Sequence, residues 1–279
     1  MKYCIPSKSE EEVYSLINGI PYGYAPYWFG GTVRPLCLDL IVPKHREELQ
    51  ERLPLIVWIC GGAMWQQDRS IWLPTLMPYV KRGYAVAAVD YRVTAQAPYP
   101  AAVCDVKQAI RFLRAHSEEF CIDKEHIAVM GESAGGYLAA MAGVNDPAYD
   151  TGDWLEESSA VQAVVDYYGV ADLSMTGNDP VCDRQIAEFA DSSDPAALAQ
   201  ASPVHRVGPD APPFLIFHGD SDQLVPIAES EALYEALTRQ GVRADFYVLE
   251  GEDHGTDAFY QPNIREIICG FLDEVFVTA

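Results

Sequence analysis

Short apolar runs recur along the chain and are separated by segments with helical spacing. Six of these runs are rich in β-branched or aromatic residues, and most of them end at a glycine or an aspartate. Such runs are typical of strands that are buried on both faces of a sheet. They span residues 55–60, 84–90, 126–131, 163–169, 214–219 and 244–251.

Apolar residues between these runs follow the period of a helix. Val103, Val106 and Ile110 recur at three- and four-residue spacing, and Pro100 stands near the start of that segment, as a first-turn proline would. Further helices are predicted over residues 133–143, 227–240 and 263–275. Because strand and helix alternate, the sequence predicts an α/β fold with a mostly parallel central sheet and helices on both faces.

Two segments depart from this alternation. Residues 171–212 are rich in Asp, Ser, Pro and Ala, contain one weak helical stretch at 182–190, and are long for a plain connection. We expect them to form a small cap or lid over the strand ends. Residues 1–33 are predicted to be an irregular, aromatic-rich N-terminal segment. The length of 279 residues favours one domain built around one sheet.

Composition narrows the range of partners. The 41 acidic and 19 basic residues give a formal net charge of −22, which repels phosphate backbones and anionic lipid surfaces. We therefore expect neither nucleic acid nor a membrane as a partner. The seven cysteines are scattered without a C-x-x-C pair, which predicts reduced thiols, and no metal or cofactor is expected. The lack of a secretory apolar core or an 18-residue apolar run predicts a cytoplasmic location.

The most specific motif is Gly131-Glu132-Ser133-Ala134-Gly135, a G-x-S-x-G pattern. It lies where a predicted strand ends and a predicted helix begins. A strained turn at this junction presents the serine hydroxyl to a base, and the flanking glycines let neighbouring backbone come close. The pattern predicts that Ser133 is a nucleophile.

A serine nucleophile in this setting needs an acid and then a histidine later in the chain, each in a loop after a strand. His254 follows the last predicted strand and is the expected base. Asp220 and Asp222 both follow the strand before it, and we favour Asp222 as the acid that orients the base. Asp220 is then expected to brace the turn. His218 ends an apolar strand, where a structural role is expected.

Catalysis also requires hydrogen-bond donors for the negative charge that develops on a carbonyl oxygen. The backbone N–H of Ala134 follows the nucleophile at a helix start. A second source is the Cys60-Gly61-Gly62-Ala63 turn after the first predicted strand, where glycine lets main-chain N–H groups point at a ligand. We predict Gly62, Ala63 and Ala134 as the donors of an oxyanion hole.

Together these motifs resemble the α/β-hydrolase-fold esterases, in particular the hormone-sensitive-lipase-like and the bacterial feruloyl and acetyl-xylan esterase-like groups. The likeness extends from about Leu36 to Phe271. It rests on WICGGAMW (58–65), DYR (90–92), YPAAVCDVKQAIRFLR (99–114), IAVMGESAGGYLAAMAG (127–143), ASPVHRV (201–207) and PPFLIFHGDSDQLVP (212–226).

The resemblance implies a serine hydrolase that cleaves small carboxylic esters through an acyl-enzyme, with acetyl or other short acyl groups, including those on sugars and hydroxycinnamates. It also implies Asp222 as the acid. One residue departs from the family pattern, because the oxyanion turn of these groups usually begins His-Gly-Gly, whereas this chain has Cys60. The family histidine is thought to brace the turn, so the donors can persist while the geometry of the turn changes.

Two other interpretations remain open. A peptidase of the prolyl-oligopeptidase type or an arylformamidase would use the same scaffold, although the chain has no length for a propeller domain. A non-catalytic ligand-binding protein could keep the fold, but such proteins commonly lose one of the three catalytic residues, and all three are present here. Aromatic side chains near the predicted strand ends are candidates for a substrate wall, namely Trp28, Phe29, Trp65 and Tyr91.

Overall fold

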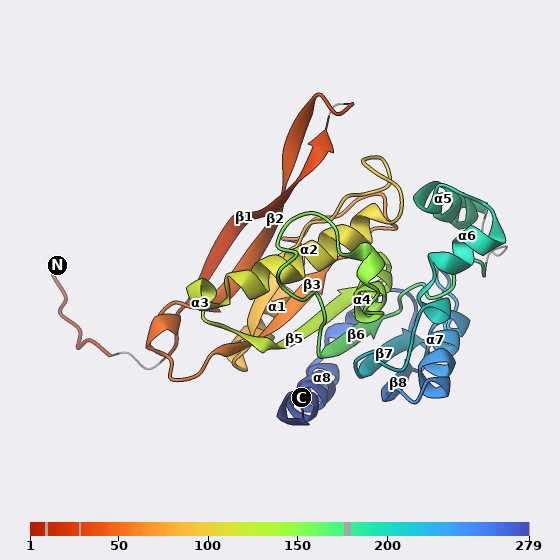
Figure 1. Ribbon diagram of the computed structural model, residues 1–279. Coiled ribbons are helices and arrows are strands. Elements are labelled where there is room, and N and C mark those ends of the chain that lie inside the picture. Colours follow the sequence, from red (N-terminus) through yellow and green to blue (C-terminus); the bar gives the residue numbers. More distant parts are fainter. Residues whose placement is uncertain (9–10, 28, 176–179, 279) are drawn as a thin grey trace.

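One mixed sheet forms the framework of the protein. The computed structural model describes residues 1–8, 11–27, 29–175 and 180–278. Within these residues, eight strands form a single sheet in the order β1-β2-β4-β3-β5-β6-β7-β8 (Figure 1). The six parallel strands are β3 (Leu53–Ile59), β4 (Ala85–Val89), β5 (Ile122–Glu132), β6 (Ala163–Tyr167), β7 (Phe214–Gly219) and β8 (Ala244–Leu249). Each corresponds to one of the predicted apolar runs, which confirms the predicted α/β fold.

The edge of the sheet formed by β1 and β2 is antiparallel. β1 (Tyr14–Tyr27) pairs with β2 (Thr32–Pro43), and β2 pairs with β4. The prediction that residues 1–33 are irregular is therefore wrong for residues 14–27. β1 contains Pro21 and Pro26, which fit there because β1 lies at the sheet edge, where a missing backbone N–H is tolerated. The pairing also shifts register at two places, which hides the regular alternation of a strand.

Helices cover both faces of the sheet. Successive residues of β3 alternate between two apolar cores, as the pleat requires: Val57 joins one core and Trp58 the other. The first core is closed by α2 (Ala101–Ala115), α4 (Ala134–Gly143) and α7 (Ala228–Arg239). The second is closed by α1 (Leu73–Lys81) and α8 (Pro262–Thr278), while the short α3 (Ser117–Phe120) follows α2.

The segment expected to be a cap contains short helices. α5 (Pro180–Ala190) and α6 (Pro195–Gln200) both lie within residues 171–212. Asp194 caps α6, because its side chain accepts a hydrogen bond from the backbone N–H of Ala196. No helix in the described ranges combines the length and apolarity that crossing a membrane requires.

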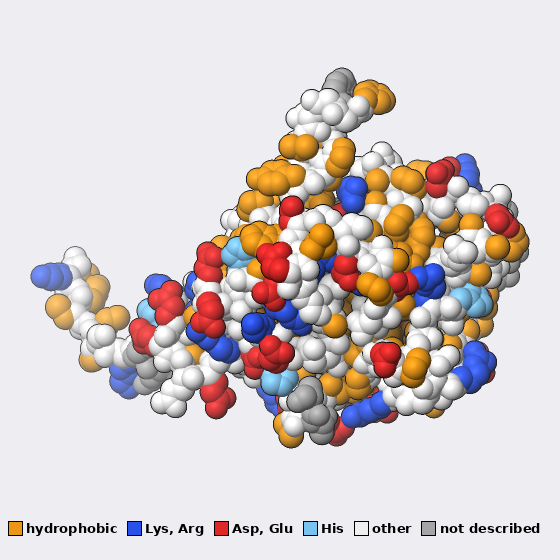
Figure 2. All heavy atoms as spheres, in the orientation of Figure 1, with side chains coloured by type: hydrophobic (Ala, Val, Ile, Leu, Met, Phe, Trp, Pro, Cys, Tyr) orange, Lys and Arg blue, Asp and Glu red, His pale blue; other side chains and the backbone are white. Residues whose placement is uncertain are grey.

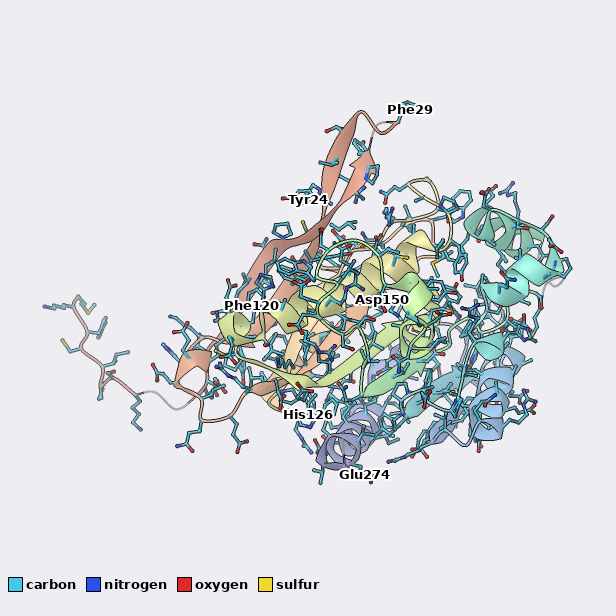
Figure 3. The ribbon with its side chains drawn as sticks, in the orientation of Figure 1. Tyr24, Phe29, Phe120, His126, Asp150 and Glu274 are labelled. Carbon is cyan, nitrogen blue, oxygen red and sulfur yellow. The ribbon has the colours of Figure 1, made fainter. Side chains whose placement is uncertain are left out.

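The β1–β2 hairpin projects from the body of the molecule (Figure 1). Hydrophobic side chains gather on this projection (Figure 2). Tyr24 is 63% exposed and Val33 is 61% exposed. Phe29 lies at the tip of the hairpin, away from the helices that cover the sheet (Figure 3).

A buried carboxyl group lies inside the sheet layer. Asp166 on β6 is 1% exposed, and its Oδ1 accepts a hydrogen bond from the Gly169 N–H at 3.0 Å. Its Oδ2 has no hydrogen-bond partner among the described residues. Burial raises the pKa of Asp166 to about 7, although the nearby His218 and the Gly169 N–H oppose this shift.

This burial predicts a specific dependence of stability on pH. The folded-state pKa of Asp166 lies above the unfolded value, so the folded protein binds an extra proton between about pH 4 and 7. Its contribution to stability is therefore present at low pH and is lost as the pH rises through this window, by about 1.4 kcal/mol per pH unit. Asp166→Asn removes this dependence. From pH 5 to pH 8, the free energy of unfolding of the variant should rise by about 3 kcal/mol relative to that of wild type, as measured by urea unfolding. If the difference between the two proteins is the same at both pH values, the assignment is contradicted.

Candidate active site

Ser133 occupies the strained bend between β5 and α4. Its backbone has φ 55° and ψ −121°, which is unfavourable for any residue with a side chain. The bend is possible only because the flanking glycines leave room. A Cβ on Gly131 would lie 2.3 Å from the Gly135 carbonyl oxygen, and one on Gly135 would lie 2.1 Å from the Ile59 carbonyl oxygen. Ser133 therefore stands at the carboxyl end of the sheet with its hydroxyl held in a fixed direction.

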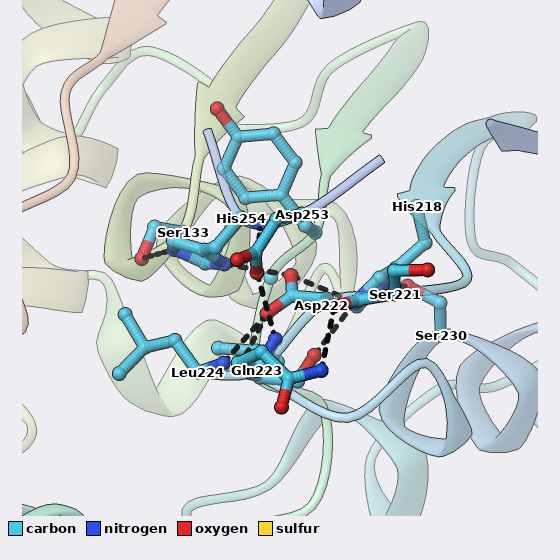
Figure 4. Close-up of polar contacts among 12 residues, drawn as sticks. Ser133, His218, Ser221, Asp222, Gln223, Leu224, Ser230, Asp253 and His254 are labelled. Carbon is cyan, nitrogen blue, oxygen red and sulfur yellow. Dashed lines mark hydrogen bonds and ion pairs between the residues drawn. The ribbon is translucent and has the colours of Figure 1, made fainter. Parts of the chain in front are cut away.

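His254 links this hydroxyl to a carboxylate (Figure 4). Its Nε2 lies 3.0 Å from Ser133 Oγ, and its Nδ1 lies 2.7 Å from Asp222 Oδ2. Both distances are within hydrogen-bond range. The three residues predicted from the sequence thus lie in one line of contacts, in which the imidazole can accept the hydroxyl proton while the carboxylate holds the ring.

Asp222 is held as an anion. Its side chain is fully buried, and its Oδ1 accepts hydrogen bonds from the backbone N–H groups of Leu224 at 2.9 Å and Val225 at 2.8 Å. Burial alone would raise the pKa of Asp222, but the hydrogen bonds from His218, His254 and the Val225 N–H outweigh it and hold the pKa well below its usual range. The carboxylate is therefore available to orient the His254 ring throughout the neutral pH range.

Asp220, the alternative acid, does another job. Its Oδ1 accepts a hydrogen bond from the Gly251 N–H at 2.6 Å, so it ties the loop after β7 to the loop after β8. Asp253 strengthens the same junction, because its Oδ1 accepts hydrogen bonds from the backbone N–H groups of Gln223 and His254. These contacts hold the base and the acid in neighbouring loops.

His218 takes part in the site as well as in the core. It is completely buried at the end of β7, and its Nε2 lies 2.9 Å from the Val225 carbonyl oxygen and 3.2 Å from Asp222 Oδ2. Its Nδ1 lies 2.7 Å from Ser230 Oγ on α7. The sequence predicted a structural role for His218, and the contact with Asp222 was missed because it depends on how the loop after β7 folds back.

Tyr168 is another contact that the sequence analysis missed. Its ring packs edge-on against the His254 ring at a centroid distance of 4.6 Å, and its hydroxyl lies 2.7 Å from the Tyr260 hydroxyl. The residue has φ 43°, an uncommon conformation for a bulky side chain. Its position directly after β6, at the same sheet edge as Ser133, is the signal that could have identified it.

The turn that was predicted to hold the oxyanion donors is anchored on two sides. The Tyr91 hydroxyl donates to the Cys60 carbonyl oxygen at 2.9 Å, and the Gly61 N–H donates to Glu132 Oε1. Further along, the Thr94 N–H donates to the Met64 carbonyl oxygen at 2.8 Å.

The conformation of this turn is unusual. Ala63 and Met64 have φ of 55° and 61°, a strained backbone of the kind that collects at functional sites. Among the described residues, the N–H groups of Gly62 and Ala63 donate to no protein acceptor. Both N–H groups thus stay available for a bound ligand.

A largely apolar cavity of about 170 Å³ opens beside Ser133. Ala63 and Ala134, from the two predicted donor segments, line it together with Ser133. The opposite wall comes from the segment expected to be a cap. Apolar lining residues are Met64, Tyr137, Val170, Leu173, Met175, Ile186, Phe189, Leu224, Val225 and Pro226, and polar ones are Asp183, Gln185, Gln223 and Glu229.

None of the described aromatic wall candidates lines this cavity. Tyr91 is completely buried behind the turn, so its prediction as a substrate wall is wrong: the residue follows a strand end, but its ring points into the core. Phe29 lies on the hairpin tip. Trp65 is 45% exposed, and its backbone N–H donates to the Gly62 carbonyl oxygen. Trp28 lies outside the described residues.

Comparison with known proteins gives consistent matches. A family model described as BD-FAE matches residues 38–237. Esterase LipQ of Mycobacterium tuberculosis is 32% identical, covering 90% of this chain and 62% of its own length. Isoprenylcysteine alpha-carbonyl methylesterase ICME of Arabidopsis thaliana is 28% identical, covering 86% of this chain and 57% of its own. The chain thus spans about six tenths of the length of the curated relatives it matches.

Solved structures are similar over most of the chain. A truncated form of a carbohydrate esterase from gut microbiota has a TM-score of 0.81 at 26% identity, covering 93% of this chain and 95% of that one. Est2, an esterase from Thermogutta terrifontis solved with butyrate bound, has a TM-score of 0.75 at 27% identity, covering 87% of this chain and 90% of that one.

The line of contacts predicts selective reactivity of Ser133. A fluorophosphonate probe should label wild type at Ser133, and Ser133→Ala should abolish the labelling. Asp222→Asn should slow labelling by about 10⁴-fold, because the imidazole loses its correct tautomer. Asp220→Asn removes a carboxylate from the same loop but keeps a side-chain oxygen that can accept the hydrogen bond from the Gly251 N–H, so it is the matched control. Equal labelling rates for the two asparagine variants, measured by gel fluorescence over time, would refute the choice of Asp222.

Proposed function

Because this chain belongs to the BD-FAE family and has the α/β-hydrolase fold, we propose that it is a carboxylic ester hydrolase that works through an acyl-enzyme on Ser133. The observation that carries the proposal is the hydrogen-bonded line from Ser133 Oγ through His254 to Asp222. The esterases among its relatives support the same class of reaction.

In the first step, Ser133 Oγ attacks the ester carbonyl carbon while His254 Nε2 takes the hydroxyl proton. Asp222 stabilises the imidazolium that forms and keeps its ring aligned. The backbone N–H groups of Gly62, Ala63 and Ala134 donate to the negatively charged carbonyl oxygen of the tetrahedral intermediate. His254 then gives its proton to the departing alcohol oxygen, and the acyl group stays on Ser133.

In the second step, a water molecule loses a proton to His254 and attacks the acyl carbon. The intermediate collapses, Ser133 recovers its proton from His254, and the carboxylic acid leaves. All of the chemistry uses side chains and backbone of the site, so the proposal includes neither a metal nor a cofactor.

We propose a short acyl group as the preferred acyl part of the substrate. The cavity beside Ser133 is mostly apolar and has a volume of about 170 Å³, and a cavity of about 150 Å³ holds one benzene molecule. Acetyl, propionyl and butyryl groups fit this space, whereas a long acyl chain does not. Residues 171–212 act as the cap in this proposal, because α5 supplies one wall of the cavity.

The alcohol part of the substrate is proposed to be a small polar molecule such as a sugar. This rests on the similarity to a structure described as a carbohydrate esterase. Trp65 is half-exposed next to the turn and is proposed as a contact for this part. The net charge of −22 disfavours a strongly anionic substrate, and we retain the cytoplasmic location as part of this proposal.

Loss of the base should slow ester hydrolysis strongly. His254→Ala should lower kcat on p-nitrophenyl acetate by about four to six orders of magnitude, because the proton acceptor is lost. KM should change much less, since the cavity is intact. Steady-state kinetics, with formanilide and a peptide amide as alternative substrates, provide the test. Rapid cleavage of either amide with inert esters would favour the peptidase or arylformamidase interpretation.

The second prediction concerns acyl size. Across p-nitrophenyl acetate, butyrate, octanoate and decanoate, kcat/KM should peak at or below butyrate and fall for the longest chains. Ile186→Ala enlarges the cavity at α5 and should move the peak to a longer chain. Val181→Ala, an exposed position on the same helix that does not line the cavity, is the control. A profile that is identical in all three proteins would contradict the proposed acyl pocket.

A further inference from the structure

The oxyanion turn needs a brace on its N–H side. Catalysis by backbone donors requires that they are fixed before charge develops on the substrate. Cys60, at the position where similar esterases carry a histidine, does not provide this support: its Sγ lies 3.9 Å from Gln67 Oε1, and burial raises the pKa of its thiol to about 12. The thiol therefore stays neutral and is directed to Gln67.

The group that does reach the turn is Glu132. Its Oε1 accepts the hydrogen bond from the Gly61 N–H, one residue before the donor Gly62. The fit is close, because a Cβ on Gly61 would lie 2.6 Å from Glu132 Oε1 and 2.7 Å from its Oε2. No side chain can stand at position 61 without displacing this carboxylate.

Glu132 is next to the nucleophile in the chain, so its contact with Gly61 links the turn to Ser133. Glu132 is the last residue of β5 and directly precedes Ser133. The nucleophile and the anchor of the turn thus come from one rigid bend, whose backbone is also held by the hydrogen bond from the Ser133 N–H to the Tyr167 carbonyl oxygen at 2.9 Å. A shift of the turn relative to Ser133 would have to break the contact with Glu132.

We propose that Glu132 is a positioning residue that holds the oxyanion turn through the Gly61 N–H, and so replaces the brace that a histidine gives in similar esterases. The proposal rests on the proposed ester hydrolysis. It does not require Glu132 to touch the substrate. The acceptor oxygen and its reach are the properties that matter, and the negative charge is secondary.

A competing role for Glu132 is electrostatic. The carboxylate is close enough to His254 for the two charges to interact, so it could act as a counter-charge for the imidazolium. Burial raises the pKa of Glu132 to about 7, against the lowering effects of the Gly61 N–H, His254 and the Trp72 indole. Two substitutions separate the roles. Glu132→Gln keeps the acceptor and its reach without the charge, and Glu132→Asp keeps the charge but is one methylene too short.

The experiment compares Glu132→Gln, Glu132→Asp and Glu132→Ala. Glu125→Gln, at an exposed position near the other end of β5, is the matched control. For a brace, kcat on p-nitrophenyl acetate should stay within about fivefold of wild type in the glutamine variant. It should fall about tenfold or more in the aspartate variant and about 100-fold in the alanine variant. KM should stay within about threefold throughout, because the cavity does not include Glu132.

Three outcomes would overturn the proposal. In the first, the glutamine variant is as slow as the alanine variant while the aspartate variant stays active. In the second, the alanine variant keeps the wild-type kcat, and in the third, only KM changes. If the alanine variant does not fold, as judged by its thermal melting curve, the glutamine and aspartate pair decides alone. If wild type cleaves no ester, the proposed function fails. In that case the rate at which a fluorophosphonate reacts with Ser133 tests the role of Glu132, and this rate should fall in the same order, from the glutamine to the aspartate to the alanine variant.

Discussion

The site depends on one geometric constraint, which is that the carboxyl ends of neighbouring parallel strands lie at the same edge of the sheet. Ser133 follows β5, while Asp222 and His254 follow β7 and β8. The 3.0 Å contact between Ser133 Oγ and His254 Nε2 joins residues 121 positions apart. Several other features of the site hold this contact, from the glycines that permit the bend to the aspartates that tie the last two loops together.

Asp222 differs from three other carboxyl groups near or within the core in the hydrogen bonds that it receives. Asp222 receives donors on both oxygens, and its pKa falls well below the usual range. Asp166 and Glu229 are buried and Glu132 is partly buried, but these three carboxyl groups receive fewer donors than Asp222, and burial raises the pKa of each to about 7. The same low-polarity interior therefore keeps one acid charged for orienting the base and lets the others become neutral near physiological pH.

The sequence predicted those features that follow from local pattern. Apolar runs located the six parallel strands, and the order of Ser133, Asp222 and His254 after strand ends predicted their convergence. Features that depend on side-chain direction were not predictable. Tyr91 follows a strand like the functional residues, yet its ring turns inward to anchor Cys60.

The edge position of β1 was equally invisible in the sequence, and residues 14–27 were therefore included in the segment that was predicted to be irregular. The G-x-S-x-G motif also did not predict the contact that Glu132 makes. The central position of G-x-S-x-G accepts many residue types, and only the structure brings this carboxylate to the Gly61 N–H. Contacts between loops that are distant in sequence are thus the part of the site that local pattern does not encode.

The most direct test of the account is to trap the covalent intermediate. The enzyme is mixed rapidly with p-nitrophenyl butyrate, quenched with acid within milliseconds, and digested for peptide mass spectrometry. The account predicts a burst of p-nitrophenol together with one butyryl group on Ser133. A peptide containing Ser133 that stays unmodified while ester is being hydrolysed, or a butyryl group found on another residue, would contradict it.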